Sequence, residues 1–423
     1  MRRGQGHRAA AQLRRAADGA RPRLVVQKYG VSVSDVRGIR DVCRRIKRAV
    51  ESGQRVVAVI SSLGQDTDRL AELAIRMKGA MPRPAARELD MLMASGEATT
   101  APLVAIGLQG IGVPAIALSG LQAGIETDAT YGGAEIQRVR PVRVRRALNA
   151  GMVAVVAGFQ GATADLDVTT LGRYGGDATA VWLAAELNAD ACEIYVSHLG
   201  IRTADPHLVP EARVLSHISY DEALELATTG LSMWQPRAVE LARQFNVAIH
   251  LRPVNRSEEG TRIVEDVPAQ LRRAVCAIGH QDGIGQIRVA DVPDRPGAGA
   301  DILESLGVHG ISANVIAHTA RCGLTFVVSE SDLEDALRVV EPVARAMGAS
   351  AIPVFDLVKL SAVGQAMQDG TGVAARMFRT LADQGINIET IASSDIRITC
   401  IIRRQEHARA VRALHAAFRL GEP

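Results

Sequence analysis

The stretch LVVQKYGVSVSDVRGIRDVCRRIKRAVESGQRVVAVIS, residues 24–61, decides the fold class. LVVQ (24–27) and VVAVIS (56–61), at its two ends, are continuous apolar runs of the kind found in strands buried on both faces. The amphipathic segment between them predicts a helix at about 34–52. A strand, a helix and a second strand in this order predict an α/β fold with a largely parallel sheet, in which ligands bind at the carboxyl ends of the strands.

Apolar runs and amphipathic segments continue to alternate beyond residue 61. Further core strands are predicted at MVAVVAGF (152–159), ACEIYV (191–196) and VAIHL (247–251). Helical patterns lie between some of them, at about 66–79, 176–188 and 220–245. Residues 24–262 are therefore expected to form one α/β domain.

The C-terminal part of the chain contains an internal repeat. After the charged segment RSEEGTRIVEDVPAQ (256–270), a plausible linker, residues 286–318 and 357–393 share one order of strand, turn, helix and strand. VHGISANVI in the first segment corresponds in position to QGINIETIA in the second. A helical stretch follows each segment, at about 331–347 and 405–419. We expect two small α+β modules, residues 263–348 with the linker and residues 349–423. Such a pair commonly holds a small ligand, so a regulatory or dimerising use is favoured over a passive structural one.

Composition excludes several classes of function. The chain has 423 residues, of which 47% are apolar and 3% aromatic, so two or three globular units are expected and base-stacking surfaces are not. Residues 1–23 carry seven arginines against one aspartate, which leaves a slightly acidic body unsuited to nucleic acid. The five cysteines are scattered and form no CxxC pair, which favours a reduced, cytoplasmic protein without a zinc site or other resident metal.

One uncharged stretch has the composition of a membrane span. Residues 98–125 contain no charged side chain, but glycines, Pro114 and two glutamines interrupt them. This pattern predicts a buried helix followed by a buried strand rather than a segment in lipid, so no membrane partner is expected. The arginine-rich residues 1–23 lack the apolar run of a secretory signal and are expected to be a disordered extension or the result of an upstream start codon.

Lysine is scarce, so the position of each lysine is informative. There are four lysines against 45 arginines, and Lys28 ends the first predicted strand, directly before a turn and a helix. Backbone N–H groups and the positive end of a helix converge at such a turn, where they favour phosphate. Lys28 could then neutralise charge on a transferring phosphoryl group. The alternative is a surface lysine with its stem on apolar surface.

Three further side chains could complete a site for an amino acid. The glycine-dense stretch 158–181 contains Arg173, which could bind a carboxylate through two parallel hydrogen bonds, and Asp177, which could orient Lys28 or a metal. Glu97 stands just before the uncharged stretch, and the ammonium group of a substrate would offset the cost of burying it. A lone glutamate at such a position is more often a helix-cap residue.

These residues lie in motifs that together resemble the aspartate kinase family of the amino acid kinase superfamily. The motifs are LVVQKYG, DMLMASGE, VAGFQG, DVTTLGR with GGD, TAVWLAAELNAD with CEIY, TADP with LVPEAR, and GINIETIASSDIRI. The resemblance implies an αβα sandwich of the amino acid kinase type, followed by two ferredoxin-like ACT modules. It also implies transfer of the γ-phosphoryl group of Mg-ATP to L-aspartate, end-product amino acids as effectors, and a homo-oligomer formed through the ACT modules.

The resemblance assigns roles to five residues that keep the family's residue types. It places the phosphate lysine at Lys28, the serine after the second strand at Ser61 and the substrate glutamate at Glu97. It places the arginine that binds the aspartate carboxylate at Arg173 and the organising aspartate at Asp177. The substrate half of the predicted site is therefore intact.

The nucleotide half departs from the family pattern. The turn after the first strand is one residue shorter, with Val31 in place of a second glycine, and Gly176 replaces a serine. Both aspartates of the segment after the CEIY strand are missing from 196–200, and His207 and Ser232 replace an arginine and a lysine. The positions assigned to this degraded nucleotide site, with Arg202 as a candidate substitute cation, are Gly30, Val196, Ser197, Arg202, His207 and Ser232.

The replacement of an arginine and a lysine by His207 and Ser232 is expected to remove two cationic contacts to ATP. Each charge-assisted contact contributes roughly 1.5–3 kcal/mol, so losing two weakens ATP binding or transfer by about a hundredfold or more. The sequence therefore leaves two hypotheses: a divergent aspartate kinase, or a catalytically degenerate relative that binds aspartate and acts as a regulatory or repurposed protein. Any effector contact is expected near Asp294, Gly297, Asn387 and Ile388, although the first module has Ala317-His318 where the family has Gln-Asn.

Overall fold

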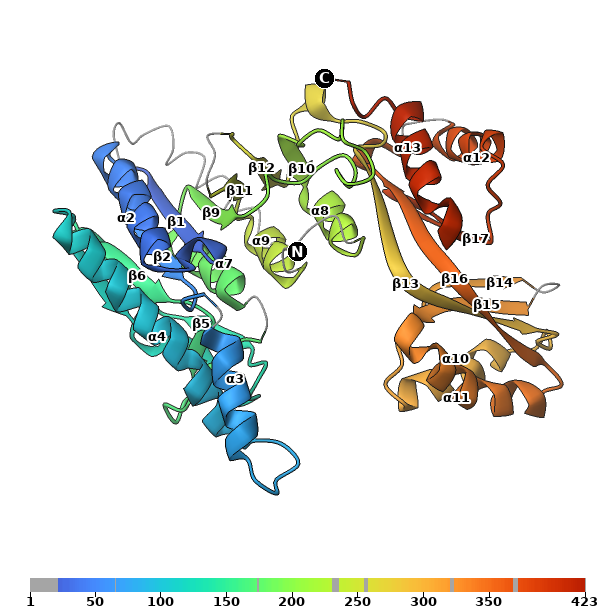
Figure 1. Cartoon of the computed structure of the whole chain (residues 1–423), viewed down its shortest axis with the longest axis horizontal. Helices are drawn as coiled ribbons and strands as arrows, with labels where there is room; N and C mark the ends of the chain where they lie inside the picture. The colour runs from blue at the N-terminus through green and yellow to red at the C-terminus, as the bar shows by residue number, and fades with distance from the viewer. Residues whose placement is uncertain are drawn as a thin grey trace, which may run out of the picture. The chain divides into compact units, whose positions relative to one another are not determined.

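The computed structural model describes residues 22–64, 66–172, 175–229, 236–254, 258–319, 323–367 and 372–422. The chain divides into two compact units (Figure 1). Unit 1 comprises Met1–His198 and Leu241–Glu258, and unit 2 comprises Leu199–Glu240 and Glu259–Pro423. The predicted basic extension, residues 1–23, lies outside the described residues except for its last two.

Unit 1 is built on parallel strands, as the alternation of strands and helices predicts. Six of them run in the order β11-β9-β1-β2-β6-β3, and every pair described among them is parallel. Their bounds are β1 (Leu24–Tyr29), β2 (Arg55–Ile60), β3 (Ala115–Leu118), β6 (Val153–Ala157), β9 (Ala191–Val196) and β11 (Ile249–Pro253). β1 lies between β2 and β9, so its carboxyl end is flanked by the ends of two other strands.

The two faces of β1 are covered by different helices. The helices of this region are α2 (Val36–Glu51), α3 (Asp66–Met77), α4 (Ala86–Gly110), α5 (Gly120–Ala123), α6 (Val142–Asn149) and α7 (Gly175–Leu187). Val25 and Tyr29 belong to an apolar core that includes Ile46 of α2 and Leu108 of α4. Because side chains alternate along a strand, Lys28 points to the opposite face, which contacts α7.

A second, four-stranded sheet lies beside α4. Its order is β5-β4-β7-β8, and α4 contacts β8. The bounds are β4 (Ile125–Thr127), β5 (Ile136–Val139), β7 (Gln160–Ala162) and β8 (Val168–Thr170). β8 precedes α7 directly in the chain, so this sheet connects α4 to the helix that carries Asp177.

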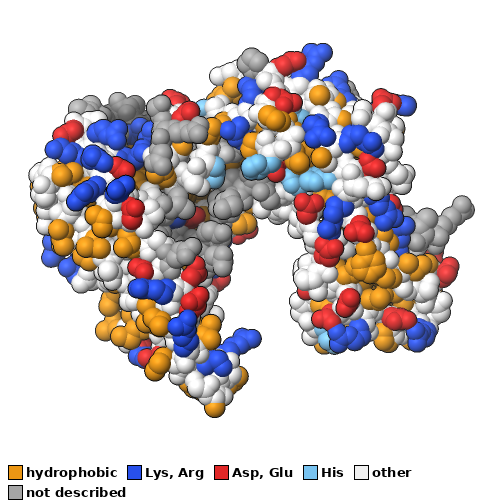
Figure 2. All heavy atoms as spheres, viewed as in Figure 1, with side chains coloured by type: hydrophobic (Ala, Val, Ile, Leu, Met, Phe, Trp, Pro, Cys, Tyr) orange, Lys and Arg blue, Asp and Glu red, His pale blue; other side chains and the backbone are white. Residues whose placement is uncertain are grey.

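Helix α4 and strand β3 occupy the uncharged stretch 98–125, as predicted. By length and composition α4 could cross a membrane, but it is a core helix on one side: Glu97, Thr100, Val104 and Leu108 are buried in unit 1. Its other side is exposed, and Figure 2 shows apolar side chains over α3 and α4. They include Leu73, Ile75, Met77, Met91, Leu103 and Ile106.

Unit 2 begins with a short parallel pair and a capped helix. β10 (His217–Ser219) pairs with β12 (Thr261–Val264), and Ser219 and Glu222 form a reciprocal capping box at the start of α8 (Tyr220–Ala227). The Glu222 carboxylate also accepts a hydrogen bond from the backbone N–H of Gln365 at 2.7 Å. The predicted helical pattern at 220–245 thus contains α8 and α9 (Pro236–Phe245), and residues 230–235 between them lie outside the described residues.

The internal repeat forms one antiparallel sheet. Its order is β14-β15-β13-β16-β18-β17, and the two edge strands, β14 and β17, approach each other. The strands are β13 (Ala277–Ala290), β14 (Asn314–Thr319), β15 (Gly323–Ser329), β16 (Ser350–Val363), β17 (Thr390–Ser394) and β18 (Arg397–Arg403). The helices are α10 (Ala298–Val308), α11 (Leu333–Ala346), α12 (Val373–Asp383) and α13 (His407–Ala417).

The two halves of this sheet share their longest strands. Ile287 and Val289 of β13 pack with α10 and α11, whereas Ile278 near the start of the same strand packs with α12 and α13. β16 is divided in the same way, with Ala351 in the first core and Leu360 in the second. Each half of the repeat thus completes its core with a part of a strand that also serves the other half.

Two phenylalanines of unit 2 provide a test of this core. Phe326 of β15 is fully buried against α10 and α11, whereas Phe355 of β16 is 51% exposed. Phe326→Ala is expected to lower the free energy of unfolding of unit 2 by about 3–5 kcal/mol, because it removes a buried ring and leaves a cavity. Phe355→Ala, the matched control, should change it by less than about 0.5 kcal/mol. Urea denaturation followed by circular dichroism measures both, and equal losses would contradict this description of the core.

Candidate active site

Lys28 and Asp177 form an ion pair at the carboxyl end of β1. Lys28 Nζ lies 2.9 Å from Asp177 Oδ1, in an ion pair without the geometry of a hydrogen bond. The two side chains are only 13% and 5% exposed. Asp177 lies in the first turn of α7, where a carboxylate is favoured by the positive end of the helix. The structure therefore brings these two predicted residues together and shields them from water.

Space around the Lys28 ammonium is kept open by glycine. A Cβ atom at Gly30 would lie 2.7 Å from Lys28 Nζ, and one at Gly176 would lie 3.4 Å from Lys28 Cε. Ser61 Oγ is next to both glycines, at 3.7 and 3.6 Å from those Cβ positions. Ser61 directly follows β2, and its amide donates to the Tyr29 carbonyl at 3.0 Å. The Lys28 ammonium, the Ser61 hydroxyl and the two glycines thus surround one space, which lies at the carboxyl ends of β1 and β2 and at the start of α7.

Glu97 reaches the same region from α4. Its Oε1 accepts a hydrogen bond from the Ser62 amide at 3.0 Å, and its Oε2 is buried without a partner among the described residues. Gly96 permits this approach, because a Cβ there would lie 2.9 Å from the Ser62 Cβ. Glu97 is therefore not a helix-cap residue: it lies in the middle of a 25-residue helix.

Burial determines the protonation of Glu97. Burial raises the pKa of Glu97 to about 7, although hydrogen bonds from backbone amides and the positive charge of Lys28 act to lower it. An unpartnered carboxylate oxygen in a dry setting is costly, and a cation placed against it would remove that cost. The arrangement is therefore suited to a ligand that brings an ammonium group.

Asp90 supports this part of α4 and was not identified from the sequence. It is buried and accepts hydrogen bonds from the Thr170 amide and hydroxyl, both at 2.8 Å, and from the Gly132 amide at 2.9 Å. These bonds fix α4 to β8 and to the loop between β4 and β5. The signal in the sequence was spacing: Asp90 and Glu97 are seven residues apart, so they share one face of a helix.

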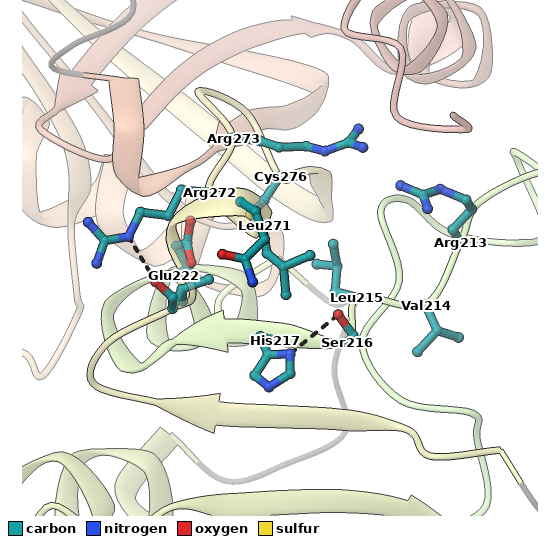
Figure 3. A pocket seen from close by; sticks show the side chains of 12 residues that line it. Arg213, Val214, Leu215, Ser216, His217, Glu222, Leu271, Arg272, Arg273 and Cys276 are labelled. Carbon is teal, nitrogen blue, oxygen red and sulfur yellow. Dashed lines mark hydrogen bonds between the residues drawn. The ribbon is translucent and has the colours of Figure 1, made fainter. Parts of the chain in front are cut away.

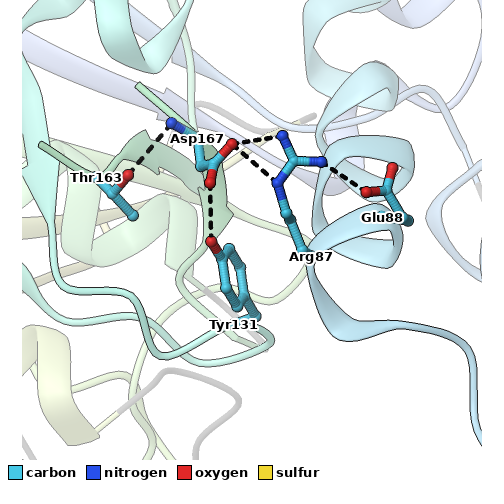
Figure 4. Close-up of polar contacts among 5 residues, drawn as sticks. All are labelled: Arg87, Glu88, Tyr131, Thr163 and Asp167. Carbon is cyan, nitrogen blue, oxygen red and sulfur yellow. Dashed lines mark hydrogen bonds and ion pairs between the residues drawn. The ribbon is translucent and has the colours of Figure 1, made fainter. Parts of the chain in front are cut away.

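A cluster of hydrogen-bonded surface residues lies at the start of α4 (Figure 4). Arg87 Nε and Nη2 donate to Asp167 Oδ1 at 2.9 and 2.5 Å, and the Tyr131 hydroxyl donates to Asp167 Oδ2 at 3.1 Å. The hydrogen bonds from Arg87 hold the pKa of Asp167 below its usual value, against the effect of desolvation. The cluster ties the loop between β7 and β8 to α4, but its exposure limits its contribution to stability.

A buried polar network lies on the opposite face of β1 and was also not identified from the sequence. The Glu193 carboxylate of β9 accepts hydrogen bonds from Gln27 and Tyr195, both at 2.9 Å, and from Arg252 at 3.1 Å. The Tyr29 hydroxyl donates to Gln27 Oε1 at 3.0 Å, and its ring stacks on Tyr195. The network joins β1, β9 and β11 directly behind Lys28, so it fixes the strand that carries the ammonium.

Two of the predicted site residues, Arg173 and Ser232, lie outside the described residues. Of the others assigned to the nucleotide, Val196 ends β9, where its carbonyl accepts from the Val254 amide, and Ser197 follows it exposed. Arg202 and His207 belong to unit 2. Arg202 Nη1 donates to the Ala212 carbonyl at 2.6 Å, and His207 is exposed.

The predicted effector residues lie in unit 2, on loops at the ends of helices. Asp294 and Gly297 are exposed before α10, and Gly297 has φ +93° at its N-cap. Asn387 is exposed and Ile388 is half-buried between α12 and β17. Nearby, Glu389 binds Arg288 and Arg403; burial acts to raise the pKa of Glu389, but these two arginines bring it below its usual value.

Unit 2 also contains a cavity of about 160 Å³, and none of the predicted site residues that the structure describes lines it (Figure 3). Its arginines bind backbone carbonyl groups: Arg213 donates to Leu420, Arg272 to Val267 and Arg273 to Arg419. Two of these three contacts hold the C-terminal end of the described chain, which gives the arginines a structural role.

The raised pKa of Glu97 predicts a pH dependence of stability. Between pH 4.5 and 7 Glu97 is charged in the unfolded chain but protonated in the folded one, so the folded protein loses stability as pH rises. Relative to wild type, Glu97→Gln should gain up to about 3 kcal/mol across this interval. Urea denaturation at pH 5 and pH 8 measures the difference. Glu88→Gln, exposed on the same helix, is the control, and a pH-independent difference for Glu97→Gln would contradict the prediction.

Comparison with known proteins agrees with the architecture. Residues 23–253 match the amino acid kinase family model, and residues 360–418 match an ACT domain model. The aspartokinase of Thermus thermophilus is 41% identical over 404 residues, which cover 94% of this chain and 99% of that protein. Two structures of Escherichia coli aspartokinase III, one with aspartate and ADP and one with lysine and aspartate, are each 20% identical to this chain. Each covers 93% of this chain and 99% of its own, with TM-scores of 0.73 and 0.75.

The matches include the N-terminal part, for which the sequence predicts an α/β domain, and the C-terminal part, for which it predicts two α+β modules. They agree with the parallel sheet of unit 1 and with the antiparallel repeat of unit 2. The expected fold class, an amino acid kinase domain followed by ACT structure, is confirmed. This chain belongs to the aspartokinase family.

Proposed function

We propose that this protein is an aspartate kinase, which transfers the γ-phosphoryl group of ATP to L-aspartate and so forms 4-phospho-L-aspartate and ADP at the entry to lysine, threonine and methionine biosynthesis. The observation that carries the proposal is the buried Glu97 oxygen, which has no partner among the described residues and lies within the electrostatic reach of the Lys28 ammonium. The Glu97 carboxyl group suits the ammonium group of an amino acid, and the Lys28 ammonium suits a phosphate. Relatives that are named aspartokinase over nearly the full chain support the same assignment.

The substrate is held by complementary charges. The α-ammonium group of L-aspartate would bind Glu97 Oε2, and this contact would favour the charged form of the glutamate. Arg173 is assigned to the substrate carboxylate on the family motif alone, because a guanidinium group can bind a carboxylate through two hydrogen bonds. Discrimination against amines without a carboxylate would follow from the second contact.

The terminal phosphates of ATP fit the space around Lys28. Gly30 and Gly176 leave room beside the Lys28 side chain, and the Ser61 hydroxyl group is next to both glycines. Mg²⁺, which enters with ATP, would supply further charge neutralisation. Asp177 holds the ammonium in place through the ion pair at 2.9 Å.

Positioning and charge would supply the rate, without a protein nucleophile. An oxygen of the substrate's β-carboxylate attacks the γ-phosphorus in line, a new O–P bond forms, and the bond to the β–γ bridging oxygen breaks as ADP leaves. Lys28 stabilises the negative charge on the transferring group. No proton transfer is required, because the attacking carboxylate is already ionised at neutral pH.

A degenerate, aspartate-binding relative is the second candidate. Its support is the altered nucleotide half: Val31 in the turn after β1, and His207 and Ser232 in place of two cations. Arg202, the candidate replacement, already donates to the Ala212 carbonyl. Such a protein would bind L-aspartate but use ATP poorly.

The ACT part is proposed to bind an end-product amino acid and to form a homo-oligomer in the cytoplasm. Asp294, Gly297 and Asn387 present exposed polar and backbone groups at the ends of α10 and α12, suited to an amino acid's ammonium and carboxylate. The four cysteines within the described residues are free and buried, which fits a reducing compartment.

Replacement of Lys28 tests the kinase proposal. Lys28→Ala should lower kcat at least about a hundredfold, because the transferring phosphoryl group loses its nearest protein cation. Lys47→Ala, in α2 and 40% exposed, is the control and should retain full activity. Trapping of the acyl phosphate with hydroxylamine measures the product, and circular dichroism checks the folding of each variant.

Titration calorimetry separates the two candidates. The kinase binds both L-aspartate and Mg-ATP and yields the trapped acyl phosphate. Aspartate binding without nucleotide binding or product would overturn the kinase proposal in favour of the degenerate relative. Unchanged turnover in Lys28→Ala would remove Lys28 from the mechanism.

The effector proposal has its own binding test. Asp294→Ala and Asn387→Ala should each weaken the binding of lysine or threonine about tenfold or more, because each removes a contact to a charged group. Asp383→Ala, exposed in α12, is the matched control. Calorimetry with each amino acid measures the change, and unchanged affinity in both variants would exclude this location.

A further inference from the structure

Two histidines of unit 2 face each other in a setting that neither the proposed kinase site nor the effector site uses. The rings of His280, in β13, and His407, at the start of α13, lie 4.2 Å apart between centroids at an angle of 51°. Each side chain is 14% exposed. Because residues two apart on a strand share a face, Asp282 lies on the same side of β13 as His280.

The three side chains place ligand atoms together. One ligand atom from each of His280, Asp282 and His407 lies within 4.8 Å of the others. Asp282 precedes Gly283, which has φ +68°, at a register shift between β13 and β16. This irregularity interrupts the pairing of the strand where the carboxylate is needed, and 53% of the Asp282 side chain is exposed, so an ion can enter from solvent.

Both imidazoles contain a nitrogen with no protein partner. His280 Nδ1 and His407 Nε2 are buried and accept or donate no hydrogen bond among the described residues. Two buried, unpaired nitrogens on rings in contact are unfavourable unless a ligand binds them. This observation is independent of the proximity of the three side chains, and a bound electrophile such as a metal ion would satisfy these nitrogens.

The surrounding charges favour a cation. His280 Nε2 lies 3.9 Å from Asp205 Oδ2, which is beyond hydrogen-bond distance but places a carboxylate on the side of the ring where many metal sites have the carboxylate that orients the histidine. His407 Nδ1 lies 3.9 Å from Asp282 Oδ1. The charge of Arg404 also acts on Asp282, but the Arg404 guanidinium is paired with Glu330.

We propose that His280, Asp282 and His407 bind a divalent transition metal of the Zn²⁺ class, with Asp205 positioning His280. Two imidazole nitrogens and one carboxylate oxygen are ligands that Zn²⁺, Co²⁺ and Ni²⁺ accept, whereas Mg²⁺ and Ca²⁺ prefer oxygen alone. Three protein ligands leave one position for water. The metal would connect β13 to the start of α13, so its role is to fix this helix on the sheet.

Metal titration of the intact chain tests the site. After chelator treatment and dialysis, wild-type protein should bind one equivalent of Zn²⁺ by calorimetry and unfold at a higher temperature with Zn²⁺ than without it. His280→Gln and His407→Gln should each weaken binding at least about tenfold, and Asp205→Asn about ten- to a hundredfold. His309→Gln, an exposed histidine at the end of α10, is the control and should bind as wild type does.

Co²⁺ gives a readout that does not depend on the folding of any variant. Bound to wild-type protein, Co²⁺ should show the intense visible absorption of a four- or five-coordinate site, and one equivalent of Zn²⁺ should abolish it. A spectrum like that of hydrated Co²⁺, less than one equivalent of Zn²⁺ bound, or unchanged affinity in folded His280→Gln and His407→Gln would each overturn the proposal. Kinase activity is not the readout, so failure here and failure of the proposed function remain distinguishable.

Discussion

The structure of unit 1 depends on keeping one ammonium group partly buried and uncovered at the end of a central strand. An isolated charge in that position is unfavourable, and the ion pair with Asp177 compensates only if the strand and the helix hold both groups firmly. The parallel sheet fixes one of them, and the first turn of α7 fixes the other. Glu97 adds a second carboxylate whose charge is suppressed by burial until a ligand arrives. The ammonium group of a small zwitterion would therefore be matched by Glu97, whereas a phosphate would share the Lys28 ammonium with Asp177.

Support for this arrangement comes from polar contacts behind the site rather than from apolar packing alone. Glu193 and its partners hold β1, β9 and β11 together on the face opposite to Lys28. Asp90 fixes α4 to β8, and β8 leads into α7. Both carboxylates are buried and accept several hydrogen bonds, the condition under which a buried charge specifies one arrangement. Glu193 therefore supports the strand that carries Lys28, and Asp90 supports the helix that carries Glu97.

Much of the fold could be predicted from the sequence, because apolar runs and helical periodicity are local signals. The strands at 24–29, 55–60 and 191–196 and the repeat are examples, and the uncharged stretch became α4 and β3 as expected. The supporting carboxylates were missed because their partners are distant: Glu193 binds Gln27 across 166 residues, and Asp90 binds Thr170 across 80. The pair of His280 and His407 was missed for the same reason. Family motifs placed Lys28, Glu97 and Asp177, but no local pattern indicates that Gly96 is what lets α4 approach Ser62.

The contribution of β13 and β16 to two separate cores has a mechanical consequence. Each is a continuous 14-residue strand, about 45 Å long when extended, and each contributes to two helix-covered cores. A bending or sliding of either strand under α10 and α11 would also act on the part beneath α12 and α13, since both parts belong to one strand and the ladder between β13 and β16 is irregular only between Gln281 and Gln286. A displacement at one end of either strand would therefore reach the other end, and the irregular register near Gly283 is where the strand would deform first.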